Sequence, residues 1–201
     1  MSTLAAPPGP WHVRGATQQM WPTRIYQRTT PTSPDTDTLA QQILDREQAD
    51  TSLSLGVEGA RKSAPDILTW DLPAIAALNG WIRDAALAVT DAGPNTTLTV
   101  AGWAVHYGQG GFHEVHAHHD SAVSGVYYLQ TSARASGALE LFDPRPARLA
   151  TASCDAAEPR TVHPHAGLLI AFPSWLRHAV APHTDGTPRL CIAFNVTAEA
   201  P

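Results

Sequence analysis

The chain has 201 residues, of which 43% are hydrophobic and 15% are charged, and its formal net charge is −5. This length and composition predict one globular domain with a substantial core. A negative charge without any cluster of basic residues argues against nucleic acid as a partner. The sequence has no apolar run long enough to span a membrane and no secretory signal, so we expect a cytoplasmic protein without a membrane partner. No pattern in it indicates an oligomeric state.

The N-terminal region begins with a segment of biased composition. Residues 1–10 are rich in Pro and Ala, residues 1–20 are predicted to be flexible, and a single domain is predicted to cover residues 21–201. Residues 21–26 are expected to form a short edge strand, because Pro22 has no N–H to donate to a central ladder.

Two helices are predicted before the middle of the chain. The first covers about residues 35–50 and takes Asp35 or Asp37 as its N-cap. The second covers about residues 71–92, with Asp71 as its N-cap, and it stops before a Gly-Pro pair. Its apolar stripe repeats with helical period at Ile75, Leu78, Ile82, Ala85 and Val89.

The second half of the chain has a different character. Short apolar or alternating runs, each bounded by Gly, Pro, Ser or Asp, are typical of strands. The expected strands cover residues 96–105, 112–119, 122–130, 138–142, 167–172, 177–182 and 189–196. This pattern predicts a mainly β fold, a double-stranded β-helix (jelly roll) with the two N-terminal helices covering one sheet.

Histidines are concentrated in one part of the chain, with five of the ten between residues 106 and 119. A single histidine is usually a surface residue, but His116 and His118 alternate, so on a strand they point to the same face, followed by Asp120. Two imidazoles that project inward together need a partner, and a metal supplies one. The distant His178 would complete three ligands on one side of a metal, which suits a non-haem iron that binds substrate and oxygen directly.

Arg189 opens the apolar segment 189–196. An arginine at the start of a buried strand is costly unless it meets an anion, and a guanidinium holds a carboxylate by two parallel hydrogen bonds. The ordinary alternative is a structural pair with an internal Asp or Glu. A metal-bound 2-oxo acid extends roughly 5–6 Å by standard bond lengths, and its distal carboxylate needs a clamp of this kind.

Longer motifs surround these residues. The chain reads Trp103, Gly110, His116, His118, Ser124-Gly-Val-Tyr-Tyr-Leu129, Phe172-Pro-Ser-Trp-Leu-Arg-His178 and Arg189-Leu-Cys-Ile-Ala-Phe-Asn195. Over about residues 96–196 it resembles the 2-oxoglutarate/Fe(II)-dependent oxygenase superfamily. More narrowly, it resembles a bacterial and phage branch with H-x-H, S-G-V-Y-Y-L and F-P-S-W-L-x-H motifs. The resemblance implies Fe(II) as the metal and 2-oxoglutarate as cosubstrate.

The resemblance also implies a role for each matching residue. The expected iron ligands are His116, His118 and His178. The expected cosubstrate contacts are Arg189, which would bind the distal carboxylate, with Tyr107, Tyr128, Cys191 and Asn195. The two tyrosines equally suit a core position with a satisfied hydroxyl.

The chain departs from the superfamily at two positions. The superfamily usually has Asp or Glu where this chain has His118, and the branch usually has Ser where this chain has Cys191. A neutral third ligand leaves one more unit of positive charge on the metal, so it should weaken iron binding and favour an anionic cosubstrate. In a shifted register, His118 and Asp120 would form the usual H-x-D pair. Asp120 is therefore the alternative second ligand, although the spacing from Gly110 favours the first register.

Two side chains are candidates for substrate contact. Arg145 follows the predicted strand at 138–142, and Trp175 lies in the loop before His178. Trp175 equally suits a role in packing its own loop. Residues 145–164 show no clear period and are the expected source of substrate specificity.

The leading hypothesis is a 2-oxoglutarate-dependent dioxygenase that hydroxylates a small molecule, an amino acid or a peptide side chain, with release of succinate and CO2. Desaturation or ring closure would use the same iron chemistry. One alternative is a three-histidine iron dioxygenase that uses no 2-oxo acid, and another is a cupin-like metal-binding module. Release of succinate distinguishes the leading hypothesis from the three-histidine dioxygenase, and loss of folding on metal removal, without any oxygen consumption, would favour the binding module.

Overall fold

The computed structural model describes residues 21–49, 57–132, 136–145 and 158–199. The expectations for residues 1–20 and for most of the segment 145–164 lie outside the described residues. The helices are α1 (Pro34–Ala49), the short 3-10 helix η1 (Ile67–Thr69) and α2 (Pro73–Thr90). The strands are β1 (Tyr26–Thr29), β2 (Val57–Lys62), β3 (Thr97–His116), β4 (Val123–Gln130), β5 (Leu139–Leu141), β6 (Arg160–Val162), β7 (Leu168–Pro173), β8 (His178–Val180) and β9 (Arg189–Glu199).

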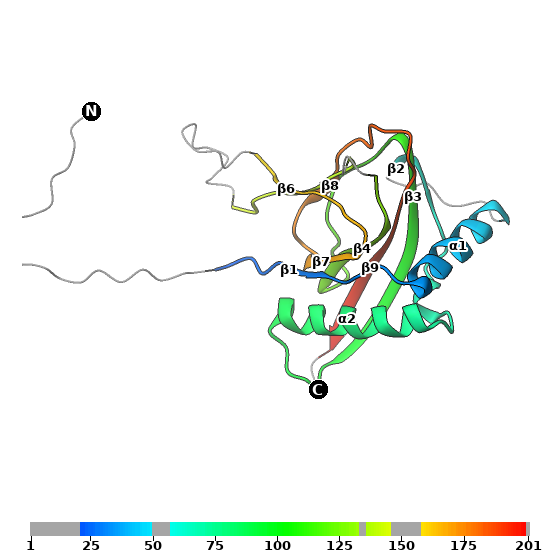
Figure 1. The fold of residues 1–201 in the computed structure, drawn as a ribbon. Helices are drawn as coiled ribbons and strands as arrows, with labels where there is room; N and C mark the ends of the chain where they lie inside the picture. Colours follow the sequence, from blue (N-terminus) through cyan, green and yellow to red (C-terminus); the bar gives the residue numbers. More distant parts are fainter. Residues whose placement is uncertain (1–20, 50–56, 133–135, 146–157, 200–201) are drawn as a thin grey trace, which may run out of the picture.

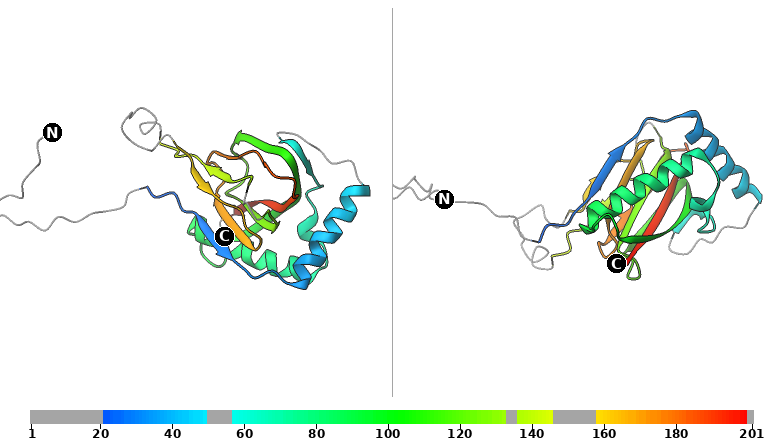
Figure 2. Two further views of the ribbon diagram at one scale, coloured as in Figure 1. Left: turned by 45° about the horizontal axis from the view of Figure 1, so that its top comes forward. Right: turned by 90° about the horizontal axis from the view of Figure 1, so that it is seen from below.

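The strands form one curled antiparallel sheet in the order β1-β7-β4-β9-β3-β8-β5-β6, and β2 also pairs with β3. Strand β3 connects the two halves of this sheet, because residues 97–107 pair with β9 and its last residues pair with β8. The two views in Figure 2 show the curl, with both helices outside it. The predicted mainly β, jelly-roll fold is therefore confirmed.

Two apolar cores lie on opposite faces of the β7-β4-β9 part of the sheet. The outer core forms where α2 packs across β1, β7 and β4 (Figure 1) and takes Tyr127 and Ile192 from the sheet. The inner core fills the curl and takes Tyr128 and Cys191, the next residues along the same two strands. This alternation is the period-two pattern of strands buried on both faces. In the part of the chain that the structure describes, no helix is long and apolar enough to cross a membrane.

The N-terminus of α1 differs from the prediction. Ser33 is the capping residue: its Oγ accepts a hydrogen bond from the Thr36 backbone N–H at 3.3 Å, and Thr36 Oγ1 accepts one from the Ser33 N–H at 2.9 Å. Pro34 then begins the helix, and Asp35 and Asp37 lie in its first turn. The predicted aspartate caps are wrong because a Ser followed by Pro is the stronger start signal.

Both ends of α2 are also shifted. Leu72, not Asp71, is the N-cap, and it makes no side-chain capping bond. At the other end Asp91 adopts a left-handed conformation with φ of 60°, so the helix ends before the Gly-Pro pair that was expected to stop it. The Asp91 carboxylate lies 2.8 Å from Arg24 Nη1, an ion pair that ties this helix end to the segment before β1.

Strand β3 is one strand of 20 residues where two were predicted. The glycines between them were interpreted as a break, but they allow a bend and a close approach of strands. Gly110 has a φ of +82°, and a Cβ at Gly59 of β2 would lie 2.9 Å from Gly111 Cα. The strand then ends at His116, so His118 and Asp120 lie beyond it.

Three edges of the sheet were predicted incompletely. The expected edge strand at residues 21–26 is displaced, and β1 instead covers Tyr26–Thr29 at one end of the sheet. Strands β2 and β6 were not predicted. Both are short and contain charged residues, and their strand state depends on partners that are remote in sequence.

Gly125 of β4 is a position where the fold has no room for a side chain. A Cβ there would lie 2.3 Å from the Phe194 ring and 2.5 Å from the Ile170 carbonyl oxygen, which is fixed in the sheet. Gly125→Ala should therefore lower the free energy of unfolding by about 1–3 kcal/mol through overpacking. Gly80→Ala in α2 is the matched control, because no heavy atom lies within 4 Å of its Cβ position. It should stabilise by about 0.5–1 kcal/mol, and equal midpoints for the two variants in urea would contradict this packing.

Candidate metal centre

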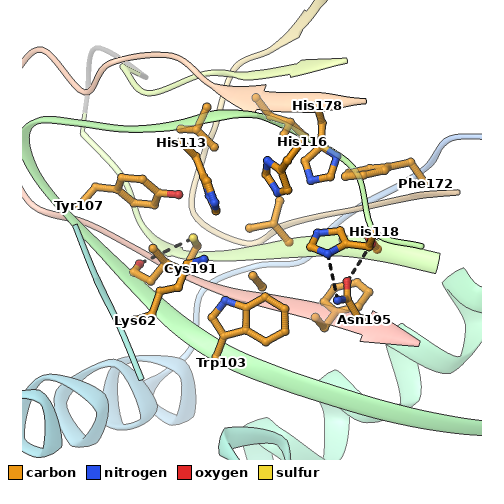
Figure 3. A pocket seen from close by; sticks show the side chains of 18 of the residues that line it. Lys62, Trp103, Tyr107, His113, His116, His118, Phe172, His178, Cys191 and Asn195 are labelled. Atoms are coloured by element: carbon orange, nitrogen blue, oxygen red, sulfur yellow. Dashed lines mark hydrogen bonds between the residues drawn. The ribbon is translucent and has the colours of Figure 1, made fainter. Parts of the chain in front are cut away.

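Three histidine side chains converge inside the curled sheet (Figure 3). His116 is the last residue of β3, and it lies directly opposite His178, the first residue of β8. His118 follows two residues later, outside the strand. The candidate ligand atoms of the three residues all lie within 4.8 Å of one another. The structure thus brings together the three residues that the sequence predicted as ligands.

Backbone carbonyls orient two of these rings. His116 Nδ1 lies 2.7 Å from the Glu114 carbonyl oxygen, and His178 Nδ1 lies 2.9 Å from the Leu176 carbonyl oxygen. A carbonyl only accepts, so each Nδ1 carries the proton and donates it. Each Nε2 is left with a lone pair for a metal, which is the usual arrangement of metal-binding histidines.

His118 is held by the neighbouring turn rather than by strand pairing. Its backbone N–H donates to the Ser174 carbonyl at 2.9 Å, and the Ser174 N–H donates to the Ala122 carbonyl at 3.1 Å. The Ser174 hydroxyl also donates to the Ser121 carbonyl. The prediction that strand alternation aligns His116 and His118 is therefore wrong about the cause, because the turn between β7 and β8 places His118.

Asn195 of β9 contacts the His118 ring. Ser124 Oγ donates to Asn195 Oδ1 at 2.7 Å, and Asn195 Nδ2 lies 3.5 Å from His118 Nδ1. A half-turn of the amide exchanges its oxygen and nitrogen, and the Ser124 hydroxyl can bond to either. In that orientation Asn195 Oδ1 accepts from His118 Nδ1–H, and all three rings present Nε2.

The three imidazoles are neutral near pH 7. Burial, followed by the charge of His116, lowers the pKa of His178 to about 3. Burial also lowers the pKa of both His116 and His118. A metal needs the unprotonated ring nitrogen, so protons do not compete strongly for this site.

Asp120 lies apart from the three histidines. It is exposed, as is His119, and it is outside the cluster of candidate ligand atoms found among the described residues. Because β3 ends at His116, the alternation that would have pointed Asp120 inward does not apply.

A cavity of about 370 Å³ connects the histidines to Arg189. Arg189 is 1% exposed, and its Cζ lies 4.4 Å from the centre of the Tyr107 ring and 4.9 Å from that of Tyr128. Among the described residues, no hydrogen-bond partner is found for its Nε and Nη1 or for the Tyr128 hydroxyl. A buried guanidinium without a carboxylate partner is costly, so these orphaned donors indicate a site for an anion.

The remaining predicted cosubstrate contacts are separated along β9. Cys191 lines the cavity, but its thiol donates to the Val105 carbonyl at 3.7 Å, and burial raises its pKa. Asn195 lies six residues from Arg189, roughly 20 Å along the strand, and it contacts His118 instead. The structure therefore associates Asn195 with the histidines and not with the guanidinium.

The two candidate substrate residues do not line this cavity. Trp175 is 52% exposed and is absent from the lining. Arg145 is also exposed, and it pairs with Asp143, whose Oδ2 lies 2.6 Å from Arg145 Nη2. Asp143 Oδ1 accepts the Arg145 backbone N–H at 3.0 Å, which is the local turn-forming role of an Asp before Pro.

Two polar side chains in the cavity were not predicted. The His113 ring stacks on His116 with centroids 4.3 Å apart, and burial, then His116, lowers its pKa to about 3. A register irregularity between these two residues in β3 places them together, so a simple alternation rule misses the pair. Lys62 of β2 also lines the cavity, and burial lowers its pKa. The one feature of the sequence that could have indicated this residue is that Lys62 is the only lysine of the chain.

Comparison with known families gives one match. Residues 101–195 match the family described as "Putative 2OG-Fe(II) oxygenase". The matched region contains His116, His118, His178 and Arg189. No curated protein matches the chain in sequence.

Solved structures with a similar fold cover most of the chain. A prolyl-4-hydroxylase of Pseudomonas putida has a TM-score of 0.65 at 19% identity, covering 88% of this chain and 93% of its own. HygX of Streptomyces hygroscopicus, with nickel, 2-oxoglutarate and hygromycin B bound, has a TM-score of 0.60 at 15% identity, covering 87% and 83%. A prolyl hydroxylase of Trichoplax adhaerens, in complex with a hypoxia inducible factor peptide fragment, has a TM-score of 0.61 at 16% identity, covering 86% and 83%.

The comparisons and the site agree with one another. The similar structures show the fold, and the family match adds the chemistry over the second half of the chain. Together with the histidine cluster, they support the predicted class, a 2-oxoglutarate-dependent dioxygenase, and the two predicted cofactors, iron and 2-oxoglutarate.

Proposed function

We propose that this chain is a 2-oxoglutarate-dependent Fe(II) oxygenase with three histidine ligands, and that it hydroxylates a small molecule or a peptide side chain. One observation carries the proposal: three neutral imidazoles and a buried guanidinium with orphaned donors line the same cavity. The first group suits a divalent transition metal, and the second suits the carboxylate of a bound acid.

The residues have distinct roles in this proposal. His116, His118 and His178 would hold the iron through Nε2, with the Glu114 and Leu176 carbonyls and Asn195 fixing the rings. When bound, iron and 2-oxoglutarate would supply the oxidation of a C–H bond by O2: one oxygen atom becomes the new hydroxyl group, and the other enters the succinate that forms, with CO2, from the cosubstrate. Placing both reactants in one cavity is the contribution of the protein.

Arg189 orients the cosubstrate. Its guanidinium donates to the distal carboxylate, and the Tyr128 hydroxyl lies beside it with its own hydrogen bond to give. Both groups are buried, so the charged contact forms in a medium of low dielectric, where it is strong. Phe172, whose ring lies 4.8 Å from that of His178, and the other apolar lining residues exclude water from the metal side.

The charge of the site favours an anion. The three candidate ligands are neutral. Among the described residues that line the cavity, the cationic side chains are Arg189 and Lys62, and the acidic side chain is Glu114, which is exposed. A divalent metal adds two further positive charges. The dianionic form of 2-oxoglutarate offsets this excess, so binding of the metal and of the cosubstrate should strengthen one another.

The proposal is tested by an anaerobic titration of the purified protein with Fe(II) and 2-oxoglutarate. We expect a weak visible charge-transfer band only when both are present, and succinate after oxygen and a substrate are added. Oxygen consumption with a substrate but without succinate would instead support a three-histidine dioxygenase that needs no 2-oxo acid. Loss of folding on metal removal, with no oxygen consumption under any condition, would support a metal-binding module.

A pair of variants tests the choice between His118 and Asp120. Asp120→Asn should leave metal affinity within about twofold, because Asp120 is exposed and outside the ligand cluster. His118→Asp restores the more usual carboxylate and should make Fe(II) binding tighter and less dependent on 2-oxoglutarate. Equilibrium dialysis with and without 2-oxoglutarate measures both effects. If Asp120→Asn abolished metal binding while His116→Ala did not, the shifted ligand set, with His118 and Asp120 as its H-x-D pair, would be correct.

A further inference from the structure

His183 is a buried ionisable group that the proposed reaction does not use. Its exposed fraction is 0%, and it lies between β8 and β9, outside the cavity lining. Its backbone is fixed to the glycine-rich bend of β3 from both sides. The His183 N–H donates to the Gly111 carbonyl at 2.8 Å, and the Gly110 N–H donates to the His183 carbonyl at 2.7 Å.

The His183 ring joins two further segments of the chain. His183 Nε2 lies 2.5 Å from the Thr187 carbonyl oxygen, two residues before Arg189, and Nδ1 lies 2.7 Å from Ser136 Oγ, three residues before β5. Asp185 completes the network, since its Oδ2 accepts from Ser136 Oγ at 3.1 Å and its Oδ1 accepts the Thr187 N–H at 3.0 Å. A network in which each ring nitrogen and each carboxylate oxygen has a partner holds its members in one geometry.

This network lies directly behind Arg189. Gly137, the residue after Ser136, has a φ of +72°, and a Cβ there would lie 3.2 Å from Arg189 Cδ and 3.5 Å from His183 Cβ. The main chain at Gly137 therefore forms one wall for the aliphatic stem of Arg189, and the rings of Tyr107 and Tyr128 lie against its guanidinium.

Arg189 is unusual in lacking an ion pair that would fix its direction. Its buried Nε and Nη1 have no hydrogen-bond partner among the described residues, so its position is set by packing and by its contacts with Tyr107 and Tyr128. A long side chain that no ion pair holds can adopt other rotamers, and each rotamer lost when a ligand binds weakens that binding. Whatever holds the wall at Gly137 in place therefore also restricts the guanidinium.

We propose that Ser136, His183 and Asp185 form a positioning network that holds the Gly137 main chain against Arg189 and so preorganises the guanidinium for the distal carboxylate of 2-oxoglutarate. The inference rests on the proposed function, because it assumes that Arg189 binds this carboxylate. The three residues touch neither the metal ligands nor the cosubstrate. They act through the position of Arg189, so their removal should affect one ligand and not the other.

Ser136→Ala tests the network. It deletes the hydroxyl between His183 and Asp185 and leaves the cavity lining intact. With Zn(II) in place of iron and without oxygen, calorimetry should show that the Kd for 2-oxoglutarate is raised roughly tenfold. An effect of this size is usual when a residue that orients a ligand-binding side chain is lost. The Kd for Zn(II) alone should stay within about twofold of the native value. Ser136→Thr keeps the hydroxyl on a half-buried residue and should restore the native Kd for 2-oxoglutarate.

Thr30→Ala is the matched control for a general loss of stability. It also deletes a buried hydroxyl, one that lies 3.3 Å from the Tyr127 hydroxyl on the helix side of the sheet. It should lower the melting temperature without changing the Kd for 2-oxoglutarate. If Ser136→Ala behaved in the same way, the network would be structural only and the inference would be overturned. If the native protein itself bound no 2-oxoglutarate, the proposed function would fail instead.

Discussion

Arg189→Met should raise the concentration of 2-oxoglutarate needed for half-saturation by roughly 10–100-fold, which corresponds to losing a charged, bidentate contact of about 1.5–3 kcal/mol. Methionine keeps most of the length of the buried stem and removes the guanidinium, so the cavity should not collapse. The measurement is a 2-oxoglutarate titration of the Fe(II) protein under nitrogen, followed by the visible charge-transfer band or by calorimetry.

The stability of the same variant separates a ligand-binding arginine from a structural one. A structural arginine has an internal carboxylate partner, and its removal leaves a buried charge unpaired at a cost of about 3–5 kcal/mol. Arg189 has no carboxylate partner among the described residues. Arg189→Met should therefore keep or raise the melting temperature of the ligand-free protein.

Arg24→Ala is the control for this pair of measurements. Arg24 forms an exposed ion pair with Asp91 and does not line the cavity, so its removal should change neither the cosubstrate affinity nor, to any large extent, the stability. A native requirement for 2-oxoglutarate in Arg189→Met, together with a large loss of stability, would remove Arg189 from its proposed role.

His178→Ala should weaken metal binding by more than roughly 100-fold, because it removes one of only three protein ligands. The charge-transfer band with Fe(II) and 2-oxoglutarate should disappear. A second readout needs no cosubstrate: Zn(II) at 100 times its Kd should stabilise the native protein by about 2.7 kcal/mol, and the variant should show no such shift in melting temperature.

His113→Ala is a closely matched control for His178→Ala. Both rings line the cavity, both pack near His116, and burial and nearby charges lower both pKa values to about 3. Only His178 belongs to the cluster of candidate ligand atoms among the described residues. His113→Ala should therefore keep its affinity for Zn(II) within a few-fold. Equal losses in the two variants would show that the three-histidine assignment is incomplete.

The elements that the sequence predicted well are those with a strong internal period. The apolar stripe of α2 and the buried runs of β4, β7 and β9 appear at nearly the expected residues. Their side chains repeat with the period of the element, so the hydrophobic pattern alone specifies both the element and its buried face. The fold class was predicted from these apolar runs and from the Gly and Pro residues that bound them.

Elements without such a period were predicted poorly. Strand β2 carries a glycine and three charged residues, and it is a strand because β3 offers it hydrogen bonds across its glycine-rich bend. Because the chain continues as a strand through the same bend, β3 is one strand where two were predicted. A glycine run is compatible with either a turn or a close approach of backbones, and only the partner strand decides between them.

Residue chemistry and spacing along the chain were enough to single out His116, His118, His178 and Arg189, because an inward pair of imidazoles and a buried guanidinium each demand a partner. The iron- and 2-oxoglutarate-dependent class was predicted from the resemblance of the surrounding motifs to a known superfamily. Contacts between remote segments were needed for the rest. They set the turn that places His118, the bulge that stacks His113 on His116, the association of Asn195 with His118, and the wall behind Arg189. Each of these contacts depends on how two segments that are remote in sequence pack together, and the local sequence pattern carries no information about that packing.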